Sequence, residues 1–589
     1  MTSDTRPWAC AAALVLVVLS CAPASASPVL IEATSLSMAD DASPPIDARK
    51  RRLSFRSTTS RAAQQNRIAP PLRGGGADPT VVGATLIVAN AAQSGEITRV
   101  TLPAAGWLAQ GSDQHPHGFT YRDRSQDAPV DQVSISADHL TVRASGPGWA
   151  YTLDEAQQGR VALRLDMGAS AWCAQAPART RGNPPSSAPY DAPGKFIGQA
   201  KAPPPAACAL NRLTVGNGFG SGVFPSGSTV HVFAAVQPQN QLVTGWTGDA
   251  GLLDDPLEWH STLVMPAADA SVAATIVARP VTLVVSTYTG TTTRPKTVRS
   301  FIPAGARGLV LFLHGTSGDD TFITKEESFY VALRALESGY GVLGTEAEEA
   351  VAGDLNGDGK LRWDASLASG NIDLGNLDSL VASLRASGAI GPTTPLLVLG
   401  MSNGGSMAVS LAAVGAAPSA ATFPNLRFAA AISFCAEGRS TAVALTTTPT
   451  AWLLCANDDN DEVDNASAAA DSAALAARGV PTMLGLHPAS PLYDQRFVRV
   501  PGVTLATSVA LAADARAAGF VGADGFFVTP TDDLIAAVTA NPSLMPSLVG
   551  LPGGVQLDVI DQVRAMQAEH QMYSDWAYRA VAFFDAHVP

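Results

Sequence analysis

The hydrophobic pattern divides the chain into two parts of different character. Before residue 280, short stretches such as 133–136 and 140–143 alternate apolar and polar positions, which is typical of β-strands. From residue 281 on, short apolar runs are separated by helical patterns, which favours a mostly parallel sheet. Eight such runs are predicted as strands: 281–286, 297–302, 308–313, 340–344, 396–399, 428–434, 451–455 and 480–486. We therefore expect an α/β domain over 281–589, preceded by two small all-β modules.

Composition sets the other boundaries. Residues 27–77 lack hydrophobic periodicity and are predicted to be a disordered linker, and 176–207, rich in Pro and Ala, a second, semi-extended linker. These linkers leave 78–175 as a small β domain and 208–279 as a second β module. Within the α/β domain, 488–560 is too long for a bare loop and carries helical patterns, which predicts a helical cap.

The first 26 residues have the pattern of a secretory signal peptide. Arg6 is followed by an apolar core over 9–19 and by the small-residue site Ala24-Ser25-Ala26. Cys21 offers the alternative of a lipid-bearing N-terminus. We expect a secreted, periplasmic or extracellular protein without a transmembrane segment. The net charge of −13 argues against a nucleic-acid partner, which would favour a basic face.

Four cysteines lie outside this leader. In an oxidising compartment an even number favours pairing. Cys173 and Cys208 flank the second linker and are able to bridge it, whereas Cys435 and Cys455 each end a predicted strand and are either a second pair or buried thiols. None has the CxxC spacing of a zinc site.

The strongest chemical motif is Gly400-Met401-Ser402-Asn403-Gly404. It lies between the apolar run 396–399 and a helical pattern that begins at residue 408. A Gly-x-Ser-x-Gly turn between a strand and a helix is the nucleophile elbow, which holds a serine hydroxyl out above the sheet. We therefore predict that Ser402 is a nucleophile, the alternative being an ordinary Gly/Ser turn.

A second motif, His314-Gly315-Thr316-Ser317-Gly318, follows the third predicted strand of the α/β domain. A loop there is able to direct a backbone N–H at a developing oxyanion, and the residue after the nucleophile supplies the other donor. These positions predict Thr316 and Asn403 as the oxyanion donors.

Together these motifs resemble the α/β-hydrolase fold, and are most similar to secreted esterases of the polyhydroxybutyrate-depolymerase and feruloyl-esterase kind. The resemblance covers about the last 300 residues and implies a Ser…Asp…His order along the chain. It places the acid after the strand 451–456, where Asp459 is the first choice and Asp461 the second. A solvated or calcium-binding acidic loop is the alternative.

The same resemblance implies a histidine near the end of the domain. His570 precedes a terminal amphipathic helix and is preferred, while His487, directly after the last strand, is the alternative. In the predicted mechanism His570 removes the proton of Ser402 and the aspartate fixes the tautomer of the imidazole.

Two further motifs suggest other roles. Asp354, Asn356 and Asp358 match the opening of a calcium loop, but Ala365 occupies the twelfth position, so the alternatives are a Ca²⁺ site completed from elsewhere and an Asx turn. No other cofactor is expected. Residues 208–279, with Gly245-Trp246-Thr247-Gly248-Asp249, resemble bacterial surface repeats of the divergent internalin-B type, which are β-grasp-like. This resemblance implies a spacer or adhesion unit.

The sequence thus favours a secreted serine esterase that forms an acyl-enzyme with an ester substrate, polymeric or surface-bound substrates included. A serine peptidase on the same fold is the alternative within enzymes. An inactive surface-binding protein is the alternative outside them, and neither acyl specificity nor oligomeric state follows from the sequence.

Overall fold

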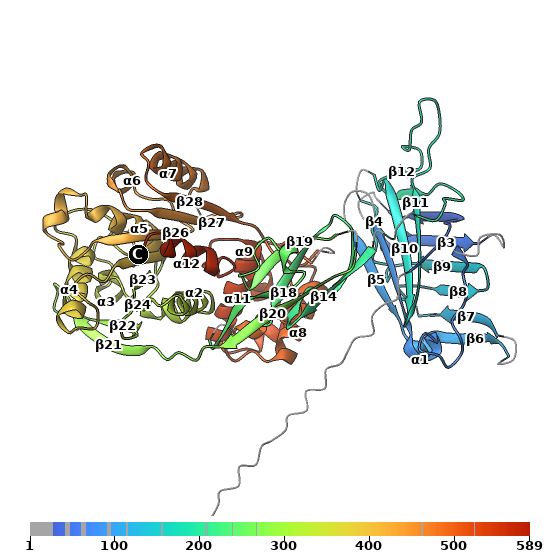
Figure 1. Cartoon of the computed structure of the whole chain (residues 1–589), viewed down its shortest axis with the longest axis horizontal. Helices are drawn as coiled ribbons and strands as arrows, with labels where there is room; N and C mark the ends of the chain where they lie inside the picture. Colours follow the sequence, from blue (N-terminus) through green and yellow to red (C-terminus); the bar gives the residue numbers. More distant parts are fainter. Residues whose placement is uncertain are drawn as a thin grey trace, which may run out of the picture. The chain divides into compact units, whose positions relative to one another are not determined.

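The computed structural model describes residues 28–588 apart from 42–46, 60–65, 91–95, 113–115, 126, 155–156, 206–207, 209, 238, 267, 461–462 and 523–524. The predicted signal peptide, with Cys21, lies outside these residues. The chain forms two compact units, one of residues up to 211 with 224–226, the other of 212–223 with 227–589 (Figure 1). In the described part, no helix is both long and apolar enough to cross a membrane.

The first unit is built from two β-sheets around one hydrophobic core. The five-stranded sheet has the order β1-β11-β10-β4-β5, and the eight-stranded sheet β12-β13-β2-β3-β9-β8-β7-β6. The strands are β1 (Val29–Leu30), β2 (Ser35–Ala39), β3 (Arg52–Thr58), β4 (Ala84–Asn90), β5 (Ile97–Leu102), β6 (Trp107–Gly111), β7 (Pro116–Arg122), β8 (Gln132–Ser136), β9 (His139–Ser145), β10 (Arg160–Met167), β11 (Ser170–Pro177), β12 (Asp191–Ala192) and β13 (Lys195–Ile197), with one short helix, α1 (Pro79–Val82).

Both predicted linkers belong largely to this unit, which corrects the sequence-based boundaries. Within 27–77, β2 and β3 pair with each other and bury Leu36, Met38, Leu53 and Phe55. These two alternations are short and stand among basic and polar residues, so the local composition hid them. In the second linker β13 pairs with β2. Cys173 and Cys208 form a disulfide, as their positions suggested.

The second β module begins the next part of the chain. Its sheets have the orders β16-β14-β20-β18 and β15-β17-β19, and β14 pairs with β20 in parallel. The strands are β14 (Leu210–Gly216), β15 (Gly218–Phe219), β16 (Gly222–Pro225), β17 (Thr229–Ala234), β18 (Gln241–Gly248), β19 (His260–Val264) and β20 (Ala270–Ala278).

The α/β domain contains one eight-stranded sheet of order β21-β22-β24-β23-β25-β26-β27-β28. The strands are β21 (Val284–Thr289), β22 (Pro295–Phe301), β23 (Leu309–Leu313), β24 (Gly341–Thr345), β25 (Leu396–Met401), β26 (Phe428–Phe434), β27 (Thr450–Cys455) and β28 (Thr482–His487). The first two are antiparallel to their neighbours and the other six run parallel. This strand order is that of the α/β-hydrolase fold.

Helices cover both faces of this sheet, as parallel strands require. Residues of α4 (Ile372–Ala386) and α5 (Asn403–Val414) share one core with β23 and β25, and α6 (Ser440–Leu445) and α7 (Asn465–Ala477) extend that layer over β27. Helices α2 (Glu326–Glu337) and α12 (Ala577–Asp585) contact each other, α2 also contacting β24 and α12 β26. The short α3 (Glu348–Ala352) follows β24.

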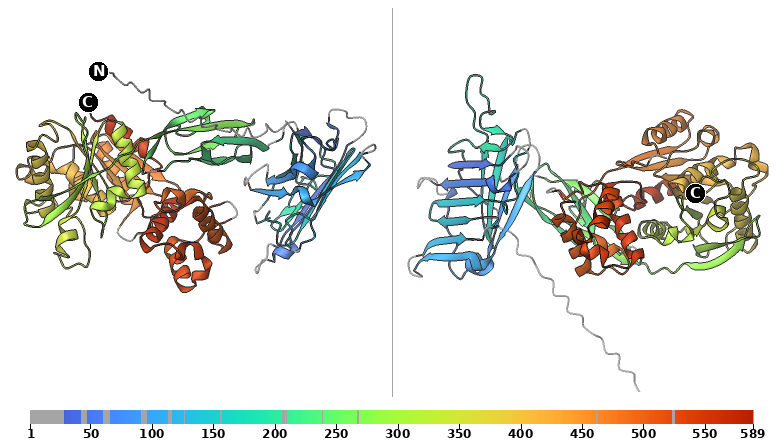
Figure 2. Two further views of the ribbon diagram at one scale, coloured as in Figure 1. Left: turned by 90° about the horizontal axis from the view of Figure 1, so that it is seen from below. Right: turned by 180° about the vertical axis from the view of Figure 1, so that it is seen from behind.

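The cap forms a separate cluster of orange to red helices (Figure 2). It comprises α8 (Leu505–Ala517), α9 (Thr531–Ala540), α10 (Pro546–Val549) and α11 (Gly553–Gln567), so it extends seven residues beyond the predicted limit at 560. Its apolar side chains, among them Phe497, Leu511, Leu534, Met545 and Val559, pack into a core of their own.

Candidate active site

The elbow after β25 has the geometry that its glycines predict. Ser402 has φ 58° and ψ −127°, a backbone conformation that residues other than glycine rarely adopt. Its N–H donates to the carbonyl oxygen of Phe434 at 2.9 Å. A Cβ at Gly400 would lie 2.1 Å from the Gly404 oxygen, and one at Gly404 2.3 Å from the Leu313 oxygen. The two glycines therefore permit the crowding that holds Ser402 in a strained turn.

The loop after β23 lies beside this elbow. A Cβ at Gly315 would be 3.1 Å from that of Ser402, closer than ordinary contact, so the space between the two loops leaves little room for a side chain at position 315. His314 is buried; its Nδ1–H donates to the Gly315 oxygen at 2.7 Å and its Nε2 accepts from the Ala347 N–H at 3.0 Å. Burial lowers the pKa of His314, so this histidine is a neutral structural member of the loop.

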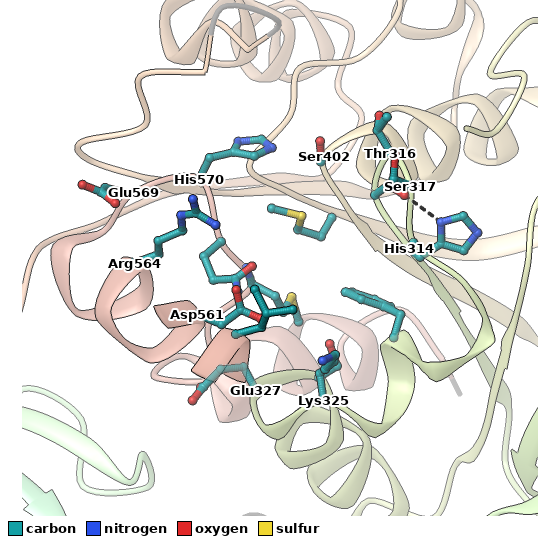
Figure 3. Close-up of a pocket in the computed structure, with 18 of the residues that line it drawn as sticks. His314, Thr316, Ser317, Lys325, Glu327, Ser402, Asp561, Arg564, Glu569 and His570 are labelled. Carbon is teal, nitrogen blue, oxygen red and sulfur yellow. Dashed lines mark hydrogen bonds between the residues drawn. The ribbon is translucent and has the colours of Figure 1, made fainter. Parts of the chain in front are cut away.

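A cavity of about 1130 Å³ opens between these loops and the cap. Ser402, His570, Thr316 and Asp459 line it, and the ring of His570 is turned toward Ser402 while Thr316 lies on the other side of the serine (Figure 3). Asn403, the first residue of α5, follows Ser402 directly, so its N–H belongs to the first-turn donors that no helical carbonyl satisfies.

The carboxylate that faces His570 is Asp458, one residue before the predicted Asp459. His570 Nδ1 lies 2.9 Å from Asp458 Oδ2 and 3.0 Å from Oδ1, and the Asp458 side chain is 1 % exposed. The side chain of Asp459 is exposed, and Asp461 lies outside the described residues. Because β27 ends at Cys455 and not at Ala456, the third position after the strand is Asp458.

Backbone contacts join the acid loop to the histidine loop. Helix α11 ends at Gln567, and Ala568 has the left-handed φ of 52°. The Asn457 N–H donates to the Ala568 oxygen at 2.9 Å and its side-chain amide to the Gln567 oxygen at 2.8 Å. The sulfurs of Cys435 and Cys455, free buried thiols 3.2 Å apart, lie 3.4 and 3.5 Å from the Gln571 oxygen.

His487, the alternative base, has a different environment. It is buried, and its Nε2 lies 2.8 Å from Asp575 Oδ2. On the other side of Asp575, His260 Nδ1 lies 3.3 Å from Oδ1. His487 is not among the residues that line the cavity. Potential ligand atoms of His260, His487 and Asp575 lie within 4.8 Å of one another, so this is the group within the described residues whose side chains are suited to hold a metal.

The predicted calcium residues use their oxygens within their own loop. Asp354 accepts the N–H groups of Gly357 at 2.7 Å and Gly359 at 2.8 Å, and Asn356 accepts that of Asp358 at 2.9 Å. Asp358 in turn pairs with Arg362. These contacts are those of successive Asx turns.

Charged and apolar side chains share the cavity wall. Seven carboxyl groups line it, from Asp319, Glu326, Glu327, Asp459, Asp532, Asp561 and Glu569, together with Lys325, Lys360 and Arg564. Burial raises the pKa of Asp561 to about 6 and that of Glu326 to about 7. Most apolar cap residues pack into the cap core, and Leu557 and Pro530 are the apolar cap residues that line the cavity.

Comparison with protein-family models and with curated protein sequences finds no match for this chain. Among solved structures, an esterase of the planctomycete Thermogutta terrifontis is similar at 15 % identity and TM-score 0.25, over 35 % of this chain and 81 % of that one. An α/β-hydrolase enzyme from a Medee basin deep-sea metagenome is similar at 15 % identity and TM-score 0.25, over 36 % and 83 %. A Bacillus cereus carboxylesterase is similar at 16 % and 0.22, over 35 % and 84 %.

Proposed function

We propose that this protein is a serine hydrolase that cleaves carboxylic esters through an acyl-enzyme. The observation that carries the proposal is that Ser402, in its strained elbow, and His570 line one cavity. The Nδ1 atom of His570 is paired with the buried carboxylate of Asp458. A hydroxyl, an imidazole and a carboxylate in this order are the parts that nucleophilic acyl transfer requires.

In the proposed reaction His570 Nε2 accepts the proton of the Ser402 hydroxyl as its oxygen attacks the ester carbonyl. Asp458 holds the Nδ1–H and stabilises the imidazolium that forms. The backbone N–H groups of Thr316 and Asn403 stabilise the oxyanion, and His570 then protonates the leaving alcohol. Water repeats the attack on the acyl-enzyme with His570 again as base, which releases the acid and restores Ser402.

The cavity wall supports a substrate that carries polar groups close to the ester. The cap contributes Asp532, Asp561, Gln562 and Arg564 to the wall, with Leu557 and Pro530 as its apolar members. Burying a long alkyl chain against these side chains would desolvate charged groups without replacing their hydrogen bonds. Small or polar esters therefore fit the cavity better than lipids do.

The experiment that tests the proposal uses the full chain with p-nitrophenyl butyrate and with a fluorophosphonate probe. We expect turnover and labelling in the wild type, and neither in Ser402→Ala. Faster cleavage of a peptide amide than of the matched ester would assign the protein to the peptidases. Failure of both turnover and labelling would leave the surface-binding alternative.

A further inference from the structure

The segment that follows His570 is held by the second β module. Three consecutive module residues, Glu258, Trp259 and His260, each contact a residue between Ser574 and Arg579, more than 300 positions along the chain. Two of them are fully or almost fully buried, and His260 is 8 % exposed. The module is thus packed into the α/β domain, in contrast to the spacer that its sequence resemblance implied.

Trp259 is the centre of this contact. Its Nε1–H donates to Ser574 Oγ at 3.1 Å, and its ring lies under the guanidinium of Arg499, 3.8 Å away, and that of Arg496, 5.1 Å away. Cations over an indole ring attract it, most strongly where water is excluded. Trp259 therefore joins the module to the cap, which supplies both arginines. The ring of the cap residue Tyr493 adds stacked contacts with Phe219 and Phe233 of the module.

Ser574 links Trp259 to Glu327 of helix α2. Its hydroxyl accepts from Trp259 and from Arg499 Nη2, 3.1 Å away, and donates to Glu327 Oε2 at 2.5 Å. Glu327 also accepts the Ser574 N–H at 2.9 Å and lies 3.0 Å from Arg499. The backbone four residues after His570 is thereby fixed from the module, the cap and α2 together.

The residues on either side of Trp259 contact the same segment. His231 Nδ1 lies 2.9 Å from His260 Nε2, and His260 and His487 flank Asp575 on opposite sides. Glu258 accepts the N–H groups of Tyr578 and Arg579 at 3.0 and 2.9 Å, which satisfies the start of α12. Both ends of the segment between His570 and α12 are therefore set: by Asp458 at one end and by the module at the other.

We infer that Trp259 is a positioning residue for His570: the second β module is part of the catalytic unit and fixes the segment that carries the base. This inference rests on the proposed function. Trp259 does not touch the reacting atoms; it acts through Ser574, whose position determines where the chain from His570 enters α12. A small displacement of a catalytic group is sufficient to reduce catalysis strongly.

The test compares full-length Trp259→Phe, Trp259→Leu and the control Val264→Thr, which changes an exposed position on β19 of the same module. Trp259→Phe keeps an aromatic ring near Arg499 but loses the N–H donor and part of the buried ring volume, whereas Trp259→Leu loses the aromatic ring as well. Rates are divided by the number of active sites titrated with fluorophosphonate, so loss of folded protein does not count. We expect kcat per site to fall about 3- to 10-fold in Trp259→Phe and about 10- to 100-fold in Trp259→Leu, with KM and the control unchanged.

Hydrogen–deuterium exchange gives a readout that does not depend on activity. Peptides covering 569–576 are expected to exchange faster in both Trp259 variants, while those covering 396–414 keep the wild-type rate. Equal rates per site and equal exchange in 569–576 for the variants and the control would overturn the inference. A uniform increase over the whole domain would also overturn it, because it indicates a general loss of stability. A wild type without turnover or labelling would refute the proposed function alone, since the exchange comparison still decides the role of the module.

Discussion

Asp458 Oδ2 lies 2.9 Å from Nδ1 of His570, and the carboxylate is buried while its neighbour Asp459 is exposed. These two adjacent aspartates make a matched pair for testing the proposed triad. We expect Asp458→Asn to lower kcat by about three to four orders of magnitude, because the imidazole then loses the acceptor that fixes its tautomer. Asp459→Asn is expected to change kcat little. A p-nitrophenyl butyrate assay with titrated sites measures both, and equal losses in the two variants would refute the assignment of the acid.

The elbow glycines give a prediction about stability. A Cβ at Gly404 would lie 2.3 Å from the backbone oxygen of Leu313, whereas one at Gly370 would meet no atom within 4 Å. We expect Gly404→Ala to reduce the free energy of unfolding by about 1–3 kcal/mol or more, because backbone atoms cannot move aside cheaply. Gly370→Ala serves as the control, with a melting temperature close to that of the wild type. Equal melting temperatures in both variants would contradict the crowded elbow.

The polar cavity wall predicts a preference for short acyl chains. A long chain in an apolar pocket would gain about 0.8 kcal/mol per buried CH₂. Seven carboxyl groups line the cavity beside the apolar side chains of Phe322, Met401, Leu557 and Met572. A long chain would desolvate some of these carboxyl groups, so we expect kcat/KM for p-nitrophenyl butyrate to exceed that for the dodecanoate by about tenfold or more. A steady rise of kcat/KM up to the dodecanoate would show that the substrate lies against a different, apolar surface.

Glu258 predicts a pH dependence of stability. Burial raises its pKa to about 8, above the usual value of 4.5. Between these values the folded chain keeps a proton that the unfolded chain has released, so this contribution to stability is full below pH 4.5 and is lost as the pH rises through 8. The glutamine side chain in the Glu258→Gln variant cannot ionise. We therefore expect the melting temperature of this variant to fall less between pH 5 and pH 8 than that of the wild type. Equal changes of melting temperature with pH in the two proteins would contradict a proton on Glu258.

The loop around Asp354 predicts the effect of a chelator. Its oxygens accept N–H groups of the same loop, which satisfies them without an ion. We therefore expect the melting temperature to be the same with EGTA and with added Ca²⁺. An increase with Ca²⁺ that is absent in Asp354→Ala would instead establish a calcium site there.

The sequence predicts best those features in which the local structure requires a particular type of residue. The elbow is recognisable because only glycine tolerates the contacts at positions 400 and 404, and the α/β pattern because buried parallel strands are continuously apolar. The predicted Asp459 lies one residue after Asp458, the carboxylate that pairs with His570. The end of a strand is uncertain by a residue, and one residue decides which carboxylate is buried. Strands β2 and β3 were missed because four buried side chains make a weak signal among basic residues.

No pattern in the sequence predicts the contacts of Trp259 and Glu258. Both residues bond to groups more than 300 positions away, and no spacing or motif relates the two segments. The resemblance of residues 208–279 to a surface repeat describes the module by itself, whereas its packing against the α/β domain depends on side chains of both.

The identity of the reacting group is tested most directly by mapping the fluorophosphonate adduct on the full chain by peptide mass spectrometry. The proposed mechanism predicts a single adduct on Ser402 in the wild type and in Asp459→Asn, with labelling slowed strongly in His570→Ala and Asp458→Asn. Labelling of a different residue, or of Ser402 at the same rate in all four proteins, would contradict a serine activated by the His570–Asp458 pair.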